Sequence, residues 1–326
     1  MTRVFVTGVA GMIGSHLLDE LLARGYDVVG IDNLSFGTLE NISHNLSNPW
    51  FWFYQVDILD FERMNALAEG ADVIVHLAAI KKTGEREPSI GTLRVNGKGT
   101  EHIFEAARIH GCKVIYASTS DVYGMSPDLP LREGGDLLIG PSMIKRWSYA
   151  VSKLYGEQIA YAYYKDYRVP MVILRYFGGF SPRSSFTWSG GHIPLFVDAI
   201  LHNREVIIHG DGTQTRSMAY VTDLVEGTML AMENEAAVGE IFNIGNDEEL
   251  SVIETAYLIK KIANIEGALK LRFVPFEEVF GRYKDIMRRI PDLTKAKQIL
   301  NYHPKVSLED SIRLMIEAVQ NKHRSD

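Results

Sequence analysis

Short apolar runs alternate along the first half of the chain with longer segments whose apolar residues recur every three or four positions. The runs cover residues 3–7, 27–31, 50–56, 72–77, 113–117 and 171–175, and helical periodicity covers residues 13–22, 97–110 and 149–167. The runs are apolar almost throughout instead of at every second position, as in strands buried on both faces of a sheet. The alternation therefore predicts an α/β fold whose parallel sheet carries helices on both faces.

The pattern changes after residue 175. A loop rich in Gly and Ser is predicted over 177–192, a helix over 194–201, strands over 205–209 and 240–244, and helices over 252–263 and 308–319. We expect a nucleotide-binding domain over residues 1–175, to which a strand near 240–245 returns. A smaller, partly interleaved α/β domain, residues 176–326, is expected to bind the substrate.

A glycine-rich turn follows the first predicted strand and opens the first predicted helix. Gly8, Gly11 and Gly14 are spaced three apart, which allows a tight turn, close approach of a pyrophosphate and close packing of helix on strand. The N–H groups at the start of that helix favour the anionic pyrophosphate. Asp32, at the end of the second run, can accept both ribose hydroxyls and would repel a 2′-phosphate. The combination predicts NAD rather than NADP; the alternative is a structural turn without a ligand.

The third and fourth predicted strands end in residues that suit the same cofactor. A carboxylate at Asp57, followed by Ile58, can receive the adenine amino group, and the small residues of Leu77-Ala78-Ala79 let a cofactor lie close. Each of these residue types is also common in ordinary cores and loops.

Thr119, Tyr149 and Lys153 form the candidate catalytic group. Thr119 follows the fifth run, and Tyr149 and Lys153 are four residues apart on a predicted helix, so their side chains share one face. An ammonium beside a phenol lowers the pKa of the phenol from about 10 toward neutrality. The phenolate can then take a proton from a sugar hydroxyl held by Thr119 while hydride leaves the same carbon for a nicotinamide.

Composition removes several classes of function. The 326 residues include 34 Lys and Arg against 41 Asp and Glu, a formal net charge of -7, which argues against binding to nucleic acid or to an anionic membrane. A single cysteine, Cys112, excludes an intramolecular disulfide and a cysteine-based metal site, and no metal is expected. No apolar stretch is long enough to span a membrane. Glycines interrupt the N-terminal run, unlike a signal peptide, so we expect a cytoplasmic protein.

Several motifs together resemble the extended short-chain dehydrogenases/reductases that act on nucleotide sugars, the NAD-dependent epimerase/dehydratase family. They are Thr7-Gly8-x-x-Gly11-x-x-Gly14, His76-Leu77-Ala78-Ala79, Asn96, Val122-Tyr123-Gly124, Tyr149-x-x-x-Lys153 and Arg216. The resemblance implies a Rossmann-type doubly wound sheet and a tightly held NAD that oxidises the sugar at carbon 4. It makes Tyr149 the base, places Lys153 on the nicotinamide ribose, and has Asn96 order the loop near the cofactor.

The expected cofactor contacts are Gly8, Gly11, Met12, Ile13, Gly14, Asp32, Asn33, Asp57, Ile58, Leu77, Ala78, Ala79, Asn96, Ser118, Tyr149, Lys153 and Tyr176. The expected substrate contacts are Lys82, Thr119, Tyr149, Gly178, Arg183, His192, Arg216 and Arg289, whereas Lys81 is expected to be solvated. The family commonly forms homodimers through a helix bundle. Here Ile159, Tyr163 and Tyr167 on the helix 149–167 offer such a face, or belong to the core.

The reaction is narrowed by the residues after Thr119. Thr119-Ser120-Asp121-Val122-Tyr123-Gly124 is similar to UDP-glucuronate decarboxylases, with Asp in place of Glu. Residues 140–149 and 288–292 are similar to stretches of UDP-apiose/xylose synthase and of related decarboxylases, in which the arginine matching Arg289 is tied to decarboxylation. Oxidation at carbon 4 of a uronic acid gives a β-keto acid that loses carbon dioxide. Asp121 is expected to supply or relay the proton then needed, if burial raises its pKa. By this resemblance Ser120, Asp121 and Arg289 are expected to be catalytic together with Thr119, Tyr149 and Lys153.

Two departures leave alternatives open. Gly178 replaces an Asn that contacts the diphosphate side of the substrate in the family, and is expected to open space for another substituent. Asp121 is shorter than the family's Glu. A UDP-sugar 4-epimerase therefore remains an alternative, followed by a dehydratase, for which Ser120 is the wrong residue. A non-catalytic NAD-binding sensor is a further alternative, which the retained Thr119, Tyr149 and Lys153 disfavour.

Overall fold

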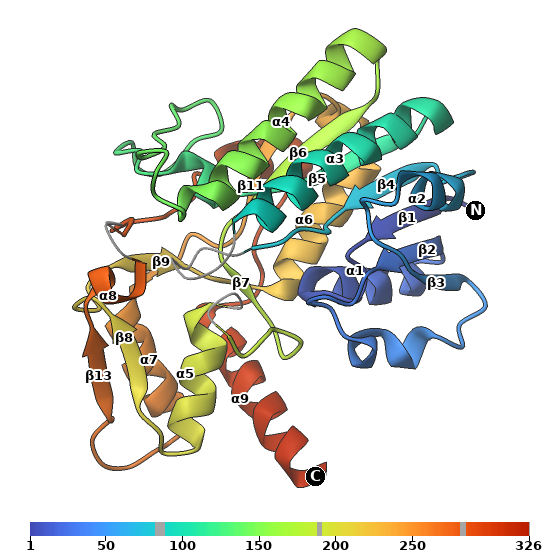
Figure 1. The fold of residues 1–326 in the computed structure, drawn as a ribbon. Helices are drawn as coiled ribbons and strands as arrows, with labels where there is room; N and C mark the ends of the chain where they lie inside the picture. The colour runs from blue at the N-terminus through green and yellow to red at the C-terminus, as the bar shows by residue number, and fades with distance from the viewer. Residues whose placement is uncertain (82–88, 188–190, 281–284, 326) are drawn as a thin grey trace.

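The computed structural model describes residues 1–81, 89–187, 191–280 and 285–325. Its centre is a parallel sheet of seven strands in the order β11-β6-β5-β4-β1-β2-β3 (Figure 1). These strands are β1 (Arg3–Thr7), β2 (Asp27–Asp32), β3 (Phe51–Gln55), β4 (Val73–His76), β5 (Lys113–Thr119), β6 (Met171–Tyr176) and β11 (Ile241–Ile244). The strand order reverses between β1 and β4, and ligands of such sheets bind at the carboxyl ends of the strands at this point.

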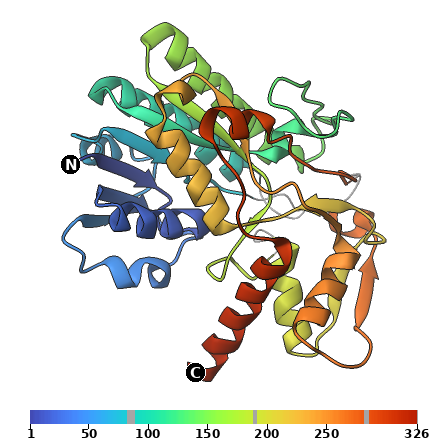
Figure 2. The same cartoon turned by 180° about the vertical axis from the view of Figure 1, so that it is seen from behind.

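Helices cover both faces of the sheet, as the sequence predicts. The helices α2 (Phe61–Leu67), α3 (Ile90–His110) and α4 (Trp147–Tyr167) lie on one face, and α1 (Met12–Ala23) and α6 (Val221–Glu233) on the other (Figures 1 and 2). Along β1, Phe5 is buried in an apolar cluster with Phe104 of α3, whereas Val4 and Val6 are buried in a second cluster with Leu17 of α1. Both faces of the central strands are therefore core.

The edge strand β3 differs from the prediction of two-sided burial. Trp52 and Tyr54 are each 38% exposed, because β3 is the outermost strand of the sheet. On α4, Ile159 and Tyr163 belong to the apolar cluster under α3, so they are core residues, whereas Tyr167 is exposed.

The elements after β6 build a smaller part of the molecule. They are β7 (Gly179–Phe180), α5 (His192–Leu201), β8 (Val206–His209), β9 (Thr215–Ser217), β10 (Ala219–Tyr220), β12 (Glu249–Ser251), α7 (Val252–Ile262), β13 (Leu271–Val274), α8 (Phe276–Phe280) and α9 (Leu308–Ser325). Among the described residues their strands pair as β10-β7, β12-β9 and β13-β8. The Ser251 hydroxyl accepts from the Glu254 N–H and begins α7 with a capping box. The described residues also form four short helices: η1 (Leu39–Asn45), η2 (Ser120–Tyr123), η4 (Glu235–Ala237) and η5 (Ala296–Leu300).

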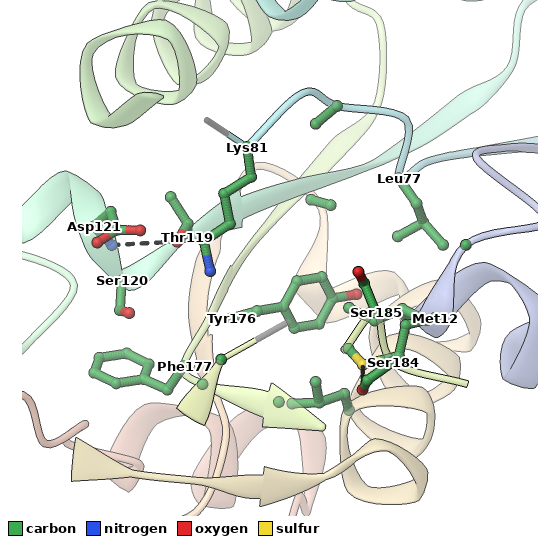
Figure 3. Close-up of a pocket in the computed structure, with 18 of the residues that line it drawn as sticks. Met12, Leu77, Lys81, Thr119, Ser120, Asp121, Tyr176, Phe177, Ser184 and Ser185 are labelled. Carbon is green, nitrogen blue, oxygen red and sulfur yellow. Dashed lines mark hydrogen bonds between the residues drawn. The ribbon is translucent and has the colours of Figure 1, made fainter. Parts of the chain in front are cut away.

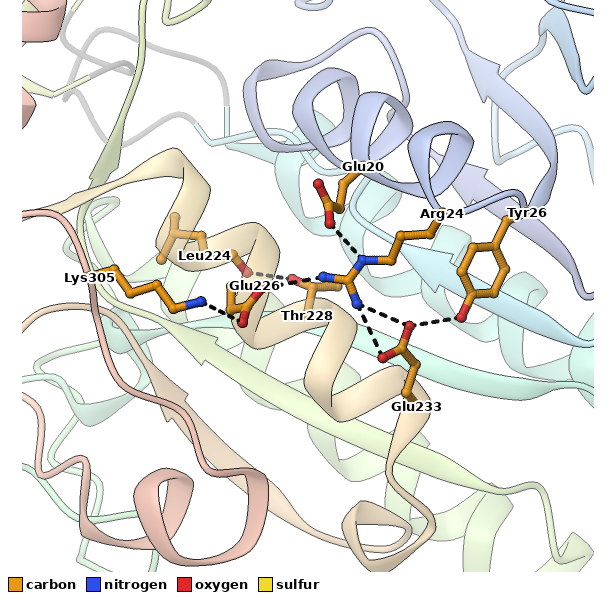
Figure 4. Close-up of polar contacts among 8 residues, drawn as sticks. All are labelled: Glu20, Arg24, Tyr26, Leu224, Glu226, Thr228, Glu233 and Lys305. Carbon is orange, nitrogen blue, oxygen red and sulfur yellow. Dashed lines mark hydrogen bonds and ion pairs between the residues drawn. The ribbon is translucent and has the colours of Figure 1, made fainter.

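Helix α6 was not predicted, and polar contacts fasten it to the rest of the nucleotide-binding part (Figure 4). Glu233 of α6 accepts from Tyr26 at 2.8 Å and from Arg24 at 3.3 Å. Glu226, about two turns earlier on the same helix, accepts from Lys305 at 2.9 Å. The same helix contributes Leu224 to the wall of the main cavity, so this network supports the site.

The strand expected near residues 240–245 is β11, which pairs in parallel with β6. The division into domains at residue 175 stays a prediction, because one apolar cluster continues from Val4 in the sheet to Ile259 of α7 and Ile312 of α9. Within the described ranges, no helix has the length and apolar character needed to cross a membrane.

Candidate active site

A cavity of about 420 Å³ lies at the carboxyl ends of the strands, between the sheet and the smaller part of the molecule. It is the site that the glycine turn predicts. Gly8 has a positive φ of 74°, and a Cβ at Gly14 would lie 2.1 Å from the Gly8 carbonyl oxygen. No side chain caps the start of α1, so its first N–H groups are available to an anion. These features fit the pyrophosphate of NAD.

Most of the expected cofactor residues line this cavity. They are Gly8, Gly11, Met12, Ile13, Gly14, Leu77, Ala79, Ser118, Tyr149, Lys153 and Tyr176. The others, Asp32, Asn33, Asp57, Ile58, Ala78 and Asn96, lie outside this lining. Phe36, Gly37 and Asn41 also line it, and the sequence analysis did not name them.

Asp32 organises the glycine turn from the end of β2. One carboxylate oxygen accepts from the Ala10 N–H at 3.1 Å, and the other from the Leu34 N–H at 2.8 Å. Burial raises the pKa of Asp32, and these two hydrogen bonds oppose the effect. Asn33 donates to Asp57 at 2.8 Å, so the polar residues that follow β2 and β3 form one connected group.

Asn96 has the ordering role that the resemblance implies. Its side-chain amide accepts from the Ile80 N–H at 2.8 Å and donates to the Ile80 carbonyl at 3.0 Å. The same nitrogen donates to Ser152 of α4 at 2.9 Å. Asn96 therefore ties the loop after β4 to the helix that carries Tyr149 and Lys153.

Thr119, Tyr149 and Lys153 come together in the cavity. Burial raises the pKa of Tyr149, the nearby Asp121 carboxylate raises it further, and the hydrogen bond with Thr119 opposes both effects. Lys153 donates to the Ala117 carbonyl at 2.7 Å, and burial lowers the pKa of Lys153 to about 7. In the protein without bound NAD the pKa of Tyr149 is thus raised and not lowered, contrary to the expected effect of Lys153.

Asp121 is held between two arginines. Its Oδ1 accepts from Arg146 at 2.7 Å and lies 2.9 Å from Nη1 of Arg289. Burial acts to raise the pKa of Asp121, but the charges of Arg146, Arg289 and Lys81 outweigh it and hold that pKa well below its ordinary value. The expectation of a raised pKa is therefore wrong: Asp121 is ionised and carries no proton to donate.

The segment that carries Arg289 is fixed to the nucleotide-binding part by its backbone. The Leu131 N–H donates to the Ile290 carbonyl and the Asp292 N–H donates to the Leu131 carbonyl, each at 2.8 Å. Ile286 also packs with Trp147 and Ala150 at the start of α4. Arg289 thus reaches Asp121 from a wall whose position is set independently of the ion pair.

Lys81 lies at the sugar side of the cavity, where the sequence predicts Lys82. Lys81 lines the cavity, and its side chain points into it on the side of Thr119 (Figure 3). Burial lowers the pKa of Lys81, and the Asp121 carboxylate opposes that effect. Lys81 is exposed to solvent as expected, but it also lines the cavity, so its position offers more than the solvated role predicted for it. Lys82 lies outside the described residues.

Ser120, which was expected to be catalytic, lines the cavity, as do the remaining expected substrate residues Gly178, Arg183, His192 and Arg216. Arg216 donates to Asp285 at 2.6 Å and to the Ile286 carbonyl at 2.7 Å. Arg183 forms an ion pair with Asp19 at 2.8 Å. Burial, together with the charge of Arg216, lowers the pKa of His192 to about 3, so this imidazole is neutral.

Comparison with known proteins decides the family. Residues 4–245 match the NAD dependent epimerase/dehydratase family. The chain belongs to this family. The UDP-N-acetyl-alpha-D-glucosaminuronate decarboxylase of Bacillus cytotoxicus is 38% identical over 97% of both chains. The UDP-glucuronic acid decarboxylase 1 of Arabidopsis thaliana is 33% identical over 98% of this chain and 70% of that protein. The crystal structure of the UDP-glucuronic acid 4-epimerase of Bacillus cereus, in complex with UDP-glucuronic acid and NAD, has a TM-score of 0.87 at 32% identity over 98% of this chain and 100% of that one.

One departure of this epimerase/dehydratase family member has a structural explanation. A Cβ at Gly178 would lie 2.5 Å from the sulfur of Met218, which also lines the cavity. The expectation that Gly178 opens space is therefore wrong, because Met218 fills the space beside it.

The sequence analysis missed Arg146 as a site residue. The Arg146-Trp147-Ser148-Tyr149 stretch was noted, but only for its similarity to decarboxylases. The position of Arg146 directly before the helix that carries Tyr149 could have indicated a role at the site, because such a residue lies near the same strand ends as Tyr149. Its partner Asp121 becomes apparent only in the folded chain.

Proposed function

We propose that the protein is an NAD-dependent decarboxylase of a UDP-hexuronic acid, and that it works by transient oxidation at carbon 4 of the sugar. The observation that carries this proposal is the charge arrangement beside Thr119 and Tyr149. Arg146, Arg289 and Lys81 surround the carboxylate of Asp121. Arg289 and Lys81 line the cavity together with Asp121, which leaves an excess of positive charge in its wall. A sugar carboxylate would neutralise that excess.

The chemistry begins at the carbon 4 hydroxyl. Thr119 holds this hydroxyl, and Tyr149, as phenolate, takes its proton. NAD, when bound, would supply the acceptor for the hydride that leaves carbon 4. Gly8, Gly11 and Gly14 would hold its pyrophosphate, and Lys153 would hold its nicotinamide ribose. The product of this step is a β-keto acid, whose carboxylate faces Arg289.

Charge also orients the nucleotide end of the substrate. Arg216 is fixed by Asp285 and by the Ile286 carbonyl, and its position in the cavity wall suits a diphosphate. Asp32 supports NAD over NADP, because the 2′-phosphate of NADP would be repelled by this buried carboxylate. The relatives in the comparison, two decarboxylases of UDP-uronic acids and one epimerase, are consistent with this class of substrate.

A 4-epimerase of a UDP-hexuronic acid is the second candidate. The structural likeness to the Bacillus cereus 4-epimerase favours it, and the same positive wall would hold the carboxylate of a uronate that is not decarboxylated. A dehydratase is less favoured, because Ser120 provides a hydroxyl where acid–base chemistry at carbons 5 and 6 needs a carboxyl group.

The deciding experiment is mass spectrometry of products from UDP-glucuronate, UDP-N-acetylglucosaminuronate and the matching neutral UDP-hexoses. The decarboxylase proposal expects a UDP-pentose and carbon dioxide from one of the uronates and no product from the hexoses. A product of unchanged mass with inverted carbon 4 would refute it and establish the epimerase.

We further propose a homodimer formed through the outer faces of α3 and α4. Leu93, Val151 and Tyr155 are 40%, 42% and 54% exposed on these neighbouring helices, and paired helices of two subunits would bury them. Replacing Val151 and Tyr155 by Lys should convert the dimer to a monomer in sedimentation analysis. A wild-type protein that sediments as a monomer would refute this proposal.

A further inference from the structure

Decarboxylation raises a question that the residues assigned above do not answer. When carbon dioxide leaves the 4-keto sugar, carbon 5 must receive a proton. Tyr149 already holds the proton from the carbon 4 hydroxyl and must return it to the same oxygen when the ketone is reduced. Asp121, the expected donor, is ionised between Arg146 and Arg289. A donor supplied by the protein therefore has to be another group that lines the cavity.

Most of the other titratable groups in the described lining are unsuited to this step. The guanidinium groups of Arg289 and Arg216 do not lose protons in proteins. His192 is neutral, with a pKa lowered to about 3 by burial and by Arg216. The Tyr176 hydroxyl is hydrogen-bonded to Thr228 at 2.6 Å, and burial raises its pKa. Lys153 is directed to the Ala117 carbonyl.

Lys81 has the properties that the step requires. It follows β4, its ammonium points into the cavity on the side of Thr119 (Figure 3), and it lies within electrostatic range of Asp121 and Arg289. Burial of the ammonium lowers its pKa, which makes the group a better acid than an ordinary lysine. The residue as a whole is exposed, so solvent can return the proton after each turnover.

We propose that Lys81 is a further catalytic residue, the acid that protonates carbon 5 of the sugar after carbon dioxide leaves. This inference rests on the proposed decarboxylase function. The electron pair of the bond between carbon 5 and the carboxylate carbon moves toward the carbon 4 ketone and gives an enolate. The enolate takes a proton from Lys81 at carbon 5 and becomes a ketone again. Lys81 is left as a neutral amine and regains a proton from water.

The test uses the stereochemistry of proton delivery. Wild-type enzyme turning over UDP-glucuronate, or whichever UDP-uronate it accepts, in deuterium oxide should place one deuterium at carbon 5 of the pentose, in only one of the two positions, as read by proton NMR. Lys81→Met should lower kcat by about 10²–10⁴-fold, and its residual product should carry deuterium in both positions. Lys81→Arg keeps the charge without a usable acid, so it should behave like Lys81→Met.

Lys261, exposed at the end of α7, provides the matched control: Lys261→Met should leave rate and stereochemistry unchanged. The midpoint of thermal unfolding and the NAD content establish that each variant is folded. Full stereospecificity in Lys81→Met, or recovery of the rate in Lys81→Arg, would overturn the assignment and leave Lys81 only an electrostatic role. Wild-type enzyme that releases no carbon dioxide from any UDP-uronate would instead refute the decarboxylase function on which the inference rests.

Discussion

Arg289 places its guanidinium 2.9 Å from the Oδ1 of Asp121, and so joins a segment near the end of the chain to the short helix η2 that follows β5. Only 3% of the Asp121 side chain and 14% of the Arg289 side chain are exposed. An ion pair with this little solvent depends on both partners, because either one alone would be a buried charge without a counterion.

Asp121→Asn removes the charge that holds Arg146 and Arg289 together. We expect the free energy of unfolding to fall by about 3–5 kcal/mol and turnover to be lost, as measured by urea denaturation and by product analysis. Glu309→Gln, which breaks an exposed ion pair with Arg313, should cost no more than about 0.5 kcal/mol. Equal stability of the two variants would contradict the role given to Asp121.

Tyr149→Phe removes the phenol that takes the substrate proton. The rate should fall by about 10²–10⁴-fold while NAD remains bound, since no cofactor contact in the glycine turn is changed. Tyr155→Phe is the control, because Tyr155 lies on the same helix and is 54% exposed. Product formation and NAD content are measured for both variants, and an active Tyr149→Phe enzyme would exclude this tyrosine as the base.

Gly14→Ala tests the pyrophosphate cradle. The new Cβ would stand 2.1 Å from the Gly8 carbonyl oxygen, so the turn has to shift and NAD should be lost from the purified protein. Among the described residues, the new Cβ of Gly91→Ala in α3 meets nothing within 4 Å, so this variant should keep its NAD. The measurement is the ratio of NAD to protein in each variant, read by absorbance after denaturation. Full NAD occupancy in Gly14→Ala would contradict the role of the glycine turn in binding the pyrophosphate.

His192 makes stability depend on pH. Its pKa is lowered from 6.5 to about 3 by burial and by Arg216, so between these values the unfolded chain binds a proton that the folded protein does not. Its contribution to stability is complete above about pH 6.5 and decreases as the pH falls, by at most about 1.4 kcal/mol per pH unit. His192→Asn should therefore lose stability less steeply than wild type between about pH 7 and pH 5. If the free energy of unfolding, measured with urea, changed equally with pH in the two proteins, His192 would not be the group responsible.

The sequence predicts the sheet well because its signals are local. The first run is β1 (Arg3–Thr7) as predicted, and the helix that begins after Gly11 follows a turn in which Gly8 has a positive φ. Helix α6 was missed although its buried Val221, Leu224, Val225, Met229 and Met232 recur with a helical period.

The sequence predicts most of the residues that line the cavity, but not the charge states of the ionisable groups among them. Thr119, Tyr149 and Lys153 follow from strand ends and helix spacing, which are properties of neighbouring residues. The state of Asp121 depends on Arg146 and Arg289, which approach it only after folding. The choice between Lys81 and Lys82 likewise depends on which way a loop side chain points, and adjacent residues give no sequence signal for that.

The sharing of one carboxylate by two guanidinium groups has a consequence for selectivity. With Asp121 satisfied, the wall still contains a buried Nε of Arg289 that has no hydrogen-bond partner among the described residues. A neutral hexose bound in this cavity would leave the positive charge of the wall shielded from water and without a counterion, which is unfavourable. A uronate brings the missing negative charge with it. If the proposed function is right, neutral UDP-hexoses should therefore be disfavoured by an electrostatic penalty, without a side chain that blocks them.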